Sequence, residues 1–169
     1  MKCKRSSPTF LFLCSLVFFF SCKKEGNRVP VQILLTDRPA ALKEVNIDLK
    51  GIQVKMEKDT SAWINLITKA GVYNLLALQN GVTDTIATDN VPIGVLKEIR
   101  FILGENNSVK ADDSLHVLTI PSGNESGLKI KIDKKLGESL NTFVLDFDAA
   151  LSVKEEANGY KLRPVIKLK

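Results

Sequence analysis

Two aspartates two residues apart, Asp146 and Asp148, are the acidic residues whose spacing best suits chemistry. In an extended strand their side chains point to one face, with Cβ atoms roughly 7 Å apart. Such a pair could hydrolyse a glycosidic bond or bind a hard cation such as Ca²⁺. We expect instead that basic residues of neighbouring strands neutralise both aspartates across the sheet. The candidate partners are Lys129, Lys131, Arg163 and Lys167.

A second oxygen-rich stretch contains Glu105, Asn106, Asn107, Asp112 and Asp113. It lacks the regular Asp/Asn spacing and the glycine of an EF-hand loop, so we expect solvated loop residues rather than a calcium site. The sequence therefore predicts no cofactor, and calcium is the one cation that we weigh as an alternative.

His116 and Trp63 are the only histidine and the only tryptophan. His116 lies out of phase between Leu115 and Val117, which predicts an outward-facing strand residue. A catalytic triad would need a serine on a strained turn, and zinc would need clustered His or Cys ligands; the sequence has neither pattern. We expect Trp63 in the core or at its rim, with a ligand-binding platform for a glycan as the alternative.

Cys22 stands at the end of a segment with a different composition from the rest of the chain. Lys2, Lys4 and Arg5 form a basic start, and an apolar run from Phe10 to Phe20 follows. This order is typical of an export signal. The run has about half of the roughly 20 residues that a membrane span needs, so it is no anchor by itself.

Ser21-Cys22 resembles the cleavage site of bacterial lipoproteins. The resemblance implies that a peptidase cuts before Cys22 and that its sulfur carries fatty acyl chains. Each buried methylene contributes roughly 0.8 kcal/mol, so several chains together give a lasting membrane anchor. Secretion with a free Cys22 and an uncleaved apolar arm are the alternatives. We expect a lipid-anchored protein of the cell envelope, at the outer membrane of a Gram-negative cell.

These observations predict a signal peptide over 1–21, a lipidated cysteine with a tether over 22–29, and one domain over 30–169. The net charge falls from +5 to +2 when the three basic residues of the signal are removed. This small charge gives no support to nucleic-acid binding. Cys22 becomes the only thiol of the mature chain, so no internal disulfide can form.

The domain shows the alternation of apolar and polar residues that is typical of strands. A slip of phase at Gly51 predicts one long strand over 44–57, bent by a β-bulge. We expect a hairpin between 151–155 and 160–168, because Asn158-Gly159 suits the two positive φ angles of a type I′ turn. Residues 72–78 are expected to run from a strand into one helical turn. Further strands are expected at 30–36, 62–67, 85–87, 99–103, 109–110, 115–120, 128–133 and 143–148.

Nine or ten short strands without sustained helical periodicity predict an all-β fold. We expect an antiparallel β-sandwich with an Ig-like or transthyretin-like Greek key, and a partly closed barrel as the alternative. Phe101, Phe143 and Phe147 fall on the predicted core faces.

The order of several motifs resembles a bacterial family, the domain-of-unknown-function 4382 family, which is found on envelope lipoproteins. The motifs include Leu35-Thr36-Asp37-Arg38-Pro39, the segment 73–81, Val91-Pro92-Ile93-Gly94, the segment 121–129 and Leu145-Asp146-Phe147-Asp148. They cover nearly the whole mature chain. The resemblance implies a β-sandwich and an envelope location, and it brings no activity, cofactor or catalytic residue.

Three functions are therefore weighed from the sequence. The first is a lipid-anchored, non-enzymatic module with a binding or structural role toward an envelope protein or glycan. The second is a surface protein that binds a glycan or calcium through Trp63, Asp146 or Asp148. The third is a hydrolase in which Glu98, Asp146 or Asp148 lies in a cleft near another acidic residue. We expect the first, and no enzyme.

Overall fold

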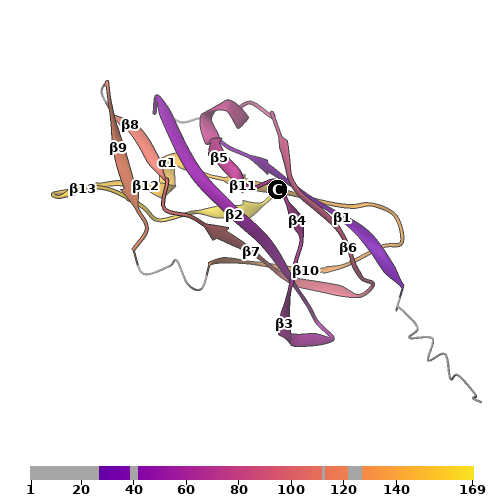
Figure 1. Cartoon of the computed structure of the whole chain (residues 1–169). Coiled ribbons are helices and arrows are strands. Elements are labelled where there is room, and N and C mark those ends of the chain that lie inside the picture. The colour runs from indigo at the N-terminus through magenta and orange to yellow at the C-terminus, as the bar shows by residue number, and fades with distance from the viewer. Residues whose placement is uncertain (1–26, 39–41, 112, 122–126) are drawn as a thin grey trace, which may run out of the picture.

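The computed structural model describes residues 27–38, 42–111, 113–121 and 127–169, with only the backbone of 59–61. Strands make up most of this part of the chain (Figure 1). In chain order the elements are β1 (Arg28–Thr36), β2 (Glu44–Met56), β3 (Asp59–Asn65), β4 (Ile67–Thr68), β5 (Gly71–Asn74), the 3₁₀ turn η1 (Leu75–Leu78), β6 (Asp84–Pro92), β7 (Val95–Leu103), β8 (Ser108–Ala111), β9 (Ser114–Thr119), β10 (Leu128–Lys135), β11 (Asn141–Phe147), α1 (Ala149–Ser152), β12 (Val153–Glu156), β13 (Gly159–Leu162) and β14 (Ile166–Leu168).

The strands form two sheets. Sheet A has the order β14-β11-β1-β6-β4, and sheet B has the order β10-β7-β2-β8-β9-β13-β12, with β3 and β5 paired to β2. The all-β sandwich is confirmed, and within the described residues the two sheets do not join into a closed barrel. Two strand pairs, β1 with β11 and β9 with β13, run parallel, so both sheets are mixed rather than purely antiparallel.

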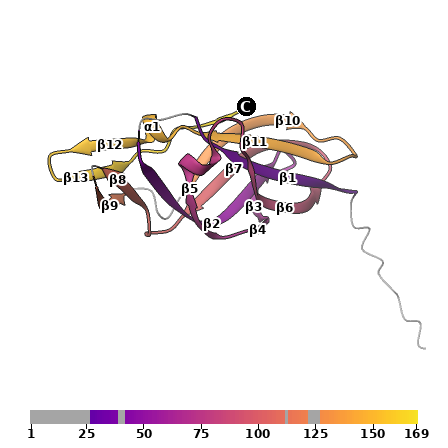
Figure 2. The same cartoon turned by 90° about the horizontal axis from the view of Figure 1, so that it is seen from above.

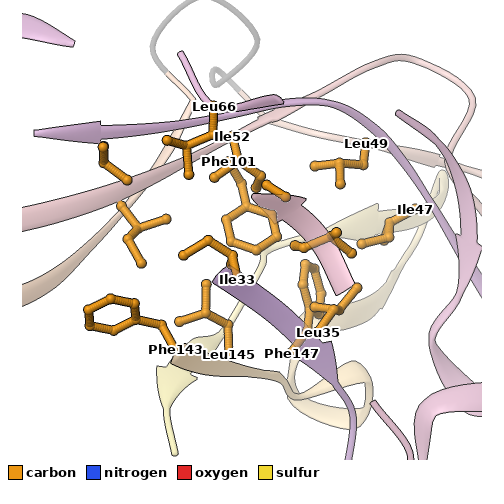
Figure 3. Close-up of a cluster of buried hydrophobic side chains, with 14 of the residues drawn as sticks. Ile33, Leu35, Ile47, Leu49, Ile52, Leu66, Phe101, Phe143, Leu145 and Phe147 are labelled. Atoms are coloured by element: carbon orange, nitrogen blue, oxygen red, sulfur yellow. The ribbon is translucent and has the colours of Figure 1, made fainter. Parts of the chain in front are cut away.

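The core lies between the two sheets. In β1 the residues Val29, Val31, Ile33 and Leu35 are almost fully buried, and the residues between them are more exposed. The three phenylalanines predicted for the core are buried as well. Figure 3 shows Phe143, Leu145 and Phe147 of β11 beside Ile33 and Leu35, facing Ile47, Leu49, Ile52 and Phe101 of sheet B. The alternation of apolar residues thus fixes which face of each strand points inward.

The bend predicted in the long strand is confirmed. The pairing of β2 with β7 shifts register between Leu49 and Gly51, and the inward face changes from Val45, Ile47 and Leu49 to Ile52, Val54 and Met56. The extra residue of a β-bulge produces this change of phase. Because both halves of β2 stay buried, one strand spans most of the sandwich.

Local predictions differ from the structure at three places. β6 covers nine residues instead of three, because its polar half pairs with the start of β1. Residues 166–168 form a separate strand beside β11 rather than extending the hairpin. The hairpin at Asn158-Gly159 exists, but Asn158 is not among the described residues with positive φ. Two consecutive positive φ angles occur instead at Asn80 and Gly81, which close the turn after η1.

The two ends of the molecule carry different parts of the chain. In both overall views β1 begins at one end, and the β12–β13 hairpin projects from the other (Figures 1 and 2). Arg28 pairs with Pro92, and the N–H of Ile93 donates to the carbonyl of Asn27 at 2.9 Å. The first described residues are therefore fastened to the β6–β7 turn.

Candidate functional site

The parallel pairing of β1 and β11 brings a cluster of aspartates together. Thr36 pairs with Asp146, so the residues that follow both strands lie side by side. Asp37, Asp146 and Asp148 are only 4%, 5% and 6% exposed. We call these three residues the aspartate cluster. It joins the ends of two strands that are 110 positions apart at the paired residues Thr36 and Asp146.

Each aspartate of the cluster has a different task. β11 ends at Phe147, and Asp148 caps the short helix α1, where its Oδ1 accepts the N–H of Leu151 at 3.0 Å. Asp37 accepts the N–H of Ala149 at 2.9 Å and the side-chain amide of Gln79 at 3.2 Å. Asp146 Oδ2 accepts a hydrogen bond from Arg38 Nε.

Of the predicted basic partners, Lys167 of β14 does lie opposite Asp146 in register, whereas Arg163 pairs with Glu156. The cation that contacts both Asp146 and Asp148 is instead Arg38, which was not predicted. Its Nε lies 2.6 Å from Asp146 Oδ2, and its Nη1 lies 3.8 Å from Asp148 Oδ2. Half of the Arg38 side chain is exposed, whereas both carboxylates are buried. Lys129 and Lys131 lie on β10, in the other sheet. The sequence pattern could not reveal Arg38, because the parallel partnership of β1 with β11 leaves no local signal.

The charges within the cluster are unequal. Burial raises the pKa of Asp37, the hydrogen bonds from Ala149 and Gln79 oppose this rise, and the neighbouring charge of Asp146 adds to it. The hydrogen bond to Asp146 raises the pKa of Arg38 above its already high value. Asp146 and Asp148 therefore share one guanidinium, whereas Asp37 is held by hydrogen bonds from Ala149 and Gln79. Among the described residues, the buried Asp146 Oδ1 has no hydrogen-bond partner.

The contacts of the aspartate cluster tie several segments of the structure together. The cluster links the end of β1, the turn after η1, the end of β11 and the start of α1. In the described part of the chain no group of three or more His, Cys, Asp or Glu side chains is placed to hold a metal ion. Asp146 and Asp148 do converge, as their spacing predicted, but on an arginine.

Trp63 lies on the outer face of sheet B, partly buried in β3. The guanidinium carbon of Arg100 is 3.7 Å from the centre of its ring, and Lys55 Nζ is 5.5 Å away. Arg100 also donates to Gln53 Oε1 at 3.2 Å. Register places Lys129 beside Arg100, and Glu98 between Lys55 and Lys131. Trp63 is thus a rim residue within a basic strip, with a cation stacked on its ring.

The second oxygen-rich stretch surrounds a buried aspartate that the sequence did not single out. Asp48 is 2% exposed, binds Lys50 Nζ at 3.0 Å and accepts the N–H of Asn106 at 3.2 Å. Asn107 is buried, and its side chain accepts the N–H of Asp48 at 2.9 Å. Asp113 pairs with Lys43, and Asp112 lies outside the described residues. Glu105, Asn106 and Asp113 are exposed, as predicted, whereas Asn107 is buried and hydrogen-bonded.

His116 does not face outward, contrary to the prediction. Leu115 and Val117 are 63% and 69% exposed, whereas the His116 ring packs at 5.0 Å between centroids on Tyr160 of β13. His116 pairs in register with the buried Val109, so it lies on the inner side of β9. His116 is thus a packing residue between β9 and β13.

Cys22, the predicted lipidation site, lies outside the described residues.

The fold and these contacts define a two-sheet β-sandwich module whose buried charges serve its structure. A family model described as "Domain of unknown function (DUF4382)" matches residues 28–164, from β1 through β13. The chain belongs to this family, which confirms the resemblance seen in its motifs. No curated protein and no solved structure matches the chain. Among the described residues, no helix has the length and apolar character needed to cross a bilayer.

Proposed function

We propose that the protein is a lipid-anchored, non-enzymatic module of the bacterial cell envelope, with a binding or structural role. The observation that carries this proposal is Cys22, which directly follows a basic start and an eleven-residue apolar run at Phe10–Phe20. Acylation also removes the one thiol that would otherwise be exposed to oxidation outside the cytoplasm. The proposal locates the anchor in the outer membrane of a Gram-negative cell, and the partner is an envelope protein or glycan.

The position of β1 suits a tether that carries load. Arg28, the first residue of β1, lies six positions after Cys22. β1 pairs with β6 on one side and with β11 on the other, so it is the middle strand of sheet A. A pull on Cys22 would therefore be resisted by two ladders of backbone hydrogen bonds rather than by a fraying edge strand.

The carboxylates considered for hydrolysis are engaged elsewhere, which supports a non-enzymatic role. Asp146 and Asp148 share Arg38. Glu98 lies in register between Lys55 and Lys131 on the outer face of a sheet. A glycosidase needs two carboxylates on either side of a sugar bond, one of them free to donate a proton.

The test is to express the full chain with Cys22→Ala and to fractionate the cells. We expect the parent chain in the membrane fraction with an acylated N-terminal peptide by mass spectrometry, and the variant outside that fraction. Cys14→Ala is the matched control, because Cys14 lies within the predicted signal and should be lost on processing. An unacylated native N-terminus at Cys22, or a Cys22→Ala chain that still sediments with membranes, would overturn the proposal.

A second candidate is recognition of an acidic glycan on the outer face of sheet B. The specific observation is the basic strip at Trp63, where Arg100 and Lys55 flank the ring and the buried Arg100 Nε has no hydrogen-bond partner. A glycan array that shows binding by the parent chain and loss of binding by Trp63→Ala would support it. Lys154→Ala on the β12 hairpin is the control, and a flat array would retire this candidate.

Calcium binding is kept for one reason, the unpaired buried Oδ1 of Asp146. A calorimetric titration with Ca²⁺ tests it directly. Heat of binding that disappears in Asp146→Asn would support a calcium site, and a flat titration of the parent chain would end the idea.

A further inference from the structure

A shallow groove crosses the outer face of sheet A near the start of β1. Its volume is about 410 Å³, and its walls include Pro30 and Gln32 of β1, Thr88 and Asn90 of β6, Ile67 of β4 and Leu140 before β11. Ile67 is 72% exposed and Leu140 is 56% exposed, so both present apolar surface to solvent. The two apolar residues flank the groove from its two ends across the sheet, Leu140 next to β11 and Ile67 on β4, with β1 and β6 between them.

Strand register places this groove at the same end of the molecule as the first described residues. Ile67 pairs with Thr88, four residues from Pro92, which itself pairs with Arg28. Measured along the strands, Ile67 therefore lies roughly 13 Å from the start of β1. Leu140 precedes Asn141, which pairs in parallel with Val31, so along the strands it lies roughly 7 Å from the same point.

The charge of this groove contrasts with that of the opposite sheet. Asp89 is its one charged lining residue, and the Asp89 carboxylate accepts the N–H of Asn90. The outer face of sheet B instead carries Lys55, Glu98 and Arg100. A groove with one charged lining residue and two exposed apolar residues fits the polar–apolar boundary of an electroneutral phospholipid surface better than the charged face does.

The tether is short enough to bring the groove to the bilayer. Arg28 lies six positions after Cys22, which allows a span of at most about 20 Å. We propose that the groove between Ile67 and Leu140 rests on the phospholipid bilayer that holds the anchor, with both side chains in the interfacial region. This inference rests on the proposed acylation of Cys22, and it adds an orientation: sheet A faces the membrane, and the β12–β13 hairpin extends away from the tether.

The test uses the full chain in its native membranes. Single cysteines are introduced as Ile67→Cys and Leu140→Cys, and each is labelled with an environment-sensitive fluorophore. Leu115→Cys is the matched control, because Leu115 is equally exposed but lies on β9, away from the groove. Lys131→Cys samples the basic face of sheet B. The unsubstituted chain is a blank, because an acylated Cys22 takes up no thiol label.

Spin-labelled lipids quench fluorophores that enter the outer 5–10 Å of a bilayer, roughly the depth that interfacial side chains reach. We expect a loss of emission at positions 67 and 140 and no loss at 115 and 131. All four exposed positions should keep the circular dichroism of the parent chain, which shows that the fold is intact.

The other outcomes are distinguishable. An unacylated N-terminal peptide or labelling of the blank would contradict the anchor itself. Acylation without quenching at 67 and 140 would contradict only the orientation. Quenching at 131 alone would mean that the basic face lies on the lipid, and excimer emission from pyrene placed at 67 or 140 would mean that a second copy covers the groove. Each of these results overturns the proposed contact.

Discussion

Buried carboxylates stabilise this domain at two places, around Asp48 and in the aspartate cluster, and the two groups are built in different ways. Asp48 finds its cation two residues away at Lys50, and its other partners come from the loop that contains Asn106 and Asn107. The aspartate cluster gathers Asp37, Asp146 and Asp148 from segments more than 100 residues apart in the chain. In the first group, which we call the local network, the cation is close to Asp48 in the chain, although the hydrogen-bond partners Asn106 and Asn107 are 58 and 59 positions away. The second group depends on the complete fold of sheet A.

The difference lies in how well each charge is neutralised. Asp48 has a cation at 3.0 Å and an N–H donor on its other oxygen. In the aspartate cluster one half-exposed arginine pairs with both Asp146 and Asp148. Asp37 instead accepts hydrogen bonds from the uncharged N–H groups of Ala149 and Gln79, and burial raises its pKa. We infer that the local network is rigid and sensitive to shape, whereas the distant cluster is sensitive to charge and pH.

The largest effect is expected at Gly104, which tests the shape of the local network. A Cβ at this position would lie 2.2 Å from Asp48 Oδ2 and 2.3 Å from Lys50 Cε. Gly104→Ala must therefore displace the ion pair, and overpacking of this kind costs about 1–3 kcal/mol of unfolding free energy. Urea denaturation followed by circular dichroism measures the loss.

Gly137→Ala is the matched control for Gly104→Ala. Its nearest atoms would be 3.9 Å from a new Cβ, and its φ is not in the left-handed range. We expect a change within about 0.5 kcal/mol. Equal losses in the two variants would show that backbone freedom, and not the fit around Asp48, decides the result at Gly104.

An intermediate effect is expected at Asp148, which separates capping from charge in the distant cluster. Asp148→Ala removes the acceptor for the N–H of Leu151, and loss of such a cap costs about 1 kcal/mol. Asp148→Asn keeps an acceptor but removes the charge that faces Arg38 at 3.8 Å. We expect the asparagine variant to recover most of the stability in urea denaturation. If both variants lose equally, the charge toward Arg38 is the stronger contribution.

Much of the fold could be predicted because apolar alternation is a local signal. The inward faces of β1 and β7, the bulge at Gly51 and the turn after η1 all follow from residues next to one another. His116 was misjudged because the alternation rule assumes that a second layer covers the apolar face. On β9 the side of Leu115 and Val117 is the exposed one.

The aspartate cluster could be predicted only in part, for a physical reason. The spacing of Asp146 and Asp148 correctly indicated that their carboxylates act together. Their cation could not be identified, because strand partnership depends on packing between distant segments and not on the sequence around either strand. Arg38 becomes a neighbour only once β1 pairs in parallel with β11. Asp48 was missed for the same reason, since the loop that buries it begins at Gly104, far along the chain.

The smallest effect at neutral pH, and the most specific one, is expected for Asp37→Asn. The amide can still accept the N–H of Ala149, and the side chain of Gln79 can rotate to pair with it. We expect a change in unfolding free energy within about 0.5 kcal/mol at pH 7. The pH dependence should nevertheless differ from that of the parent chain.

The direction follows from the raised pKa of Asp37. Its folded-state pKa lies above the unfolded value of about 3.9, so the folded state binds this proton more tightly and Asp37 lowers stability as the pH rises through that window. Asp37→Asn lacks this contribution, so its stability relative to the parent should increase from pH 3 to pH 7 in urea denaturation. Asp113→Asn, at an exposed aspartate paired with Lys43, should show no such increase. A relative stability of Asp37→Asn that falls with rising pH would mean that its hydrogen bonds outweigh its burial, and that the distant cluster is as well neutralised as the Asp48 network.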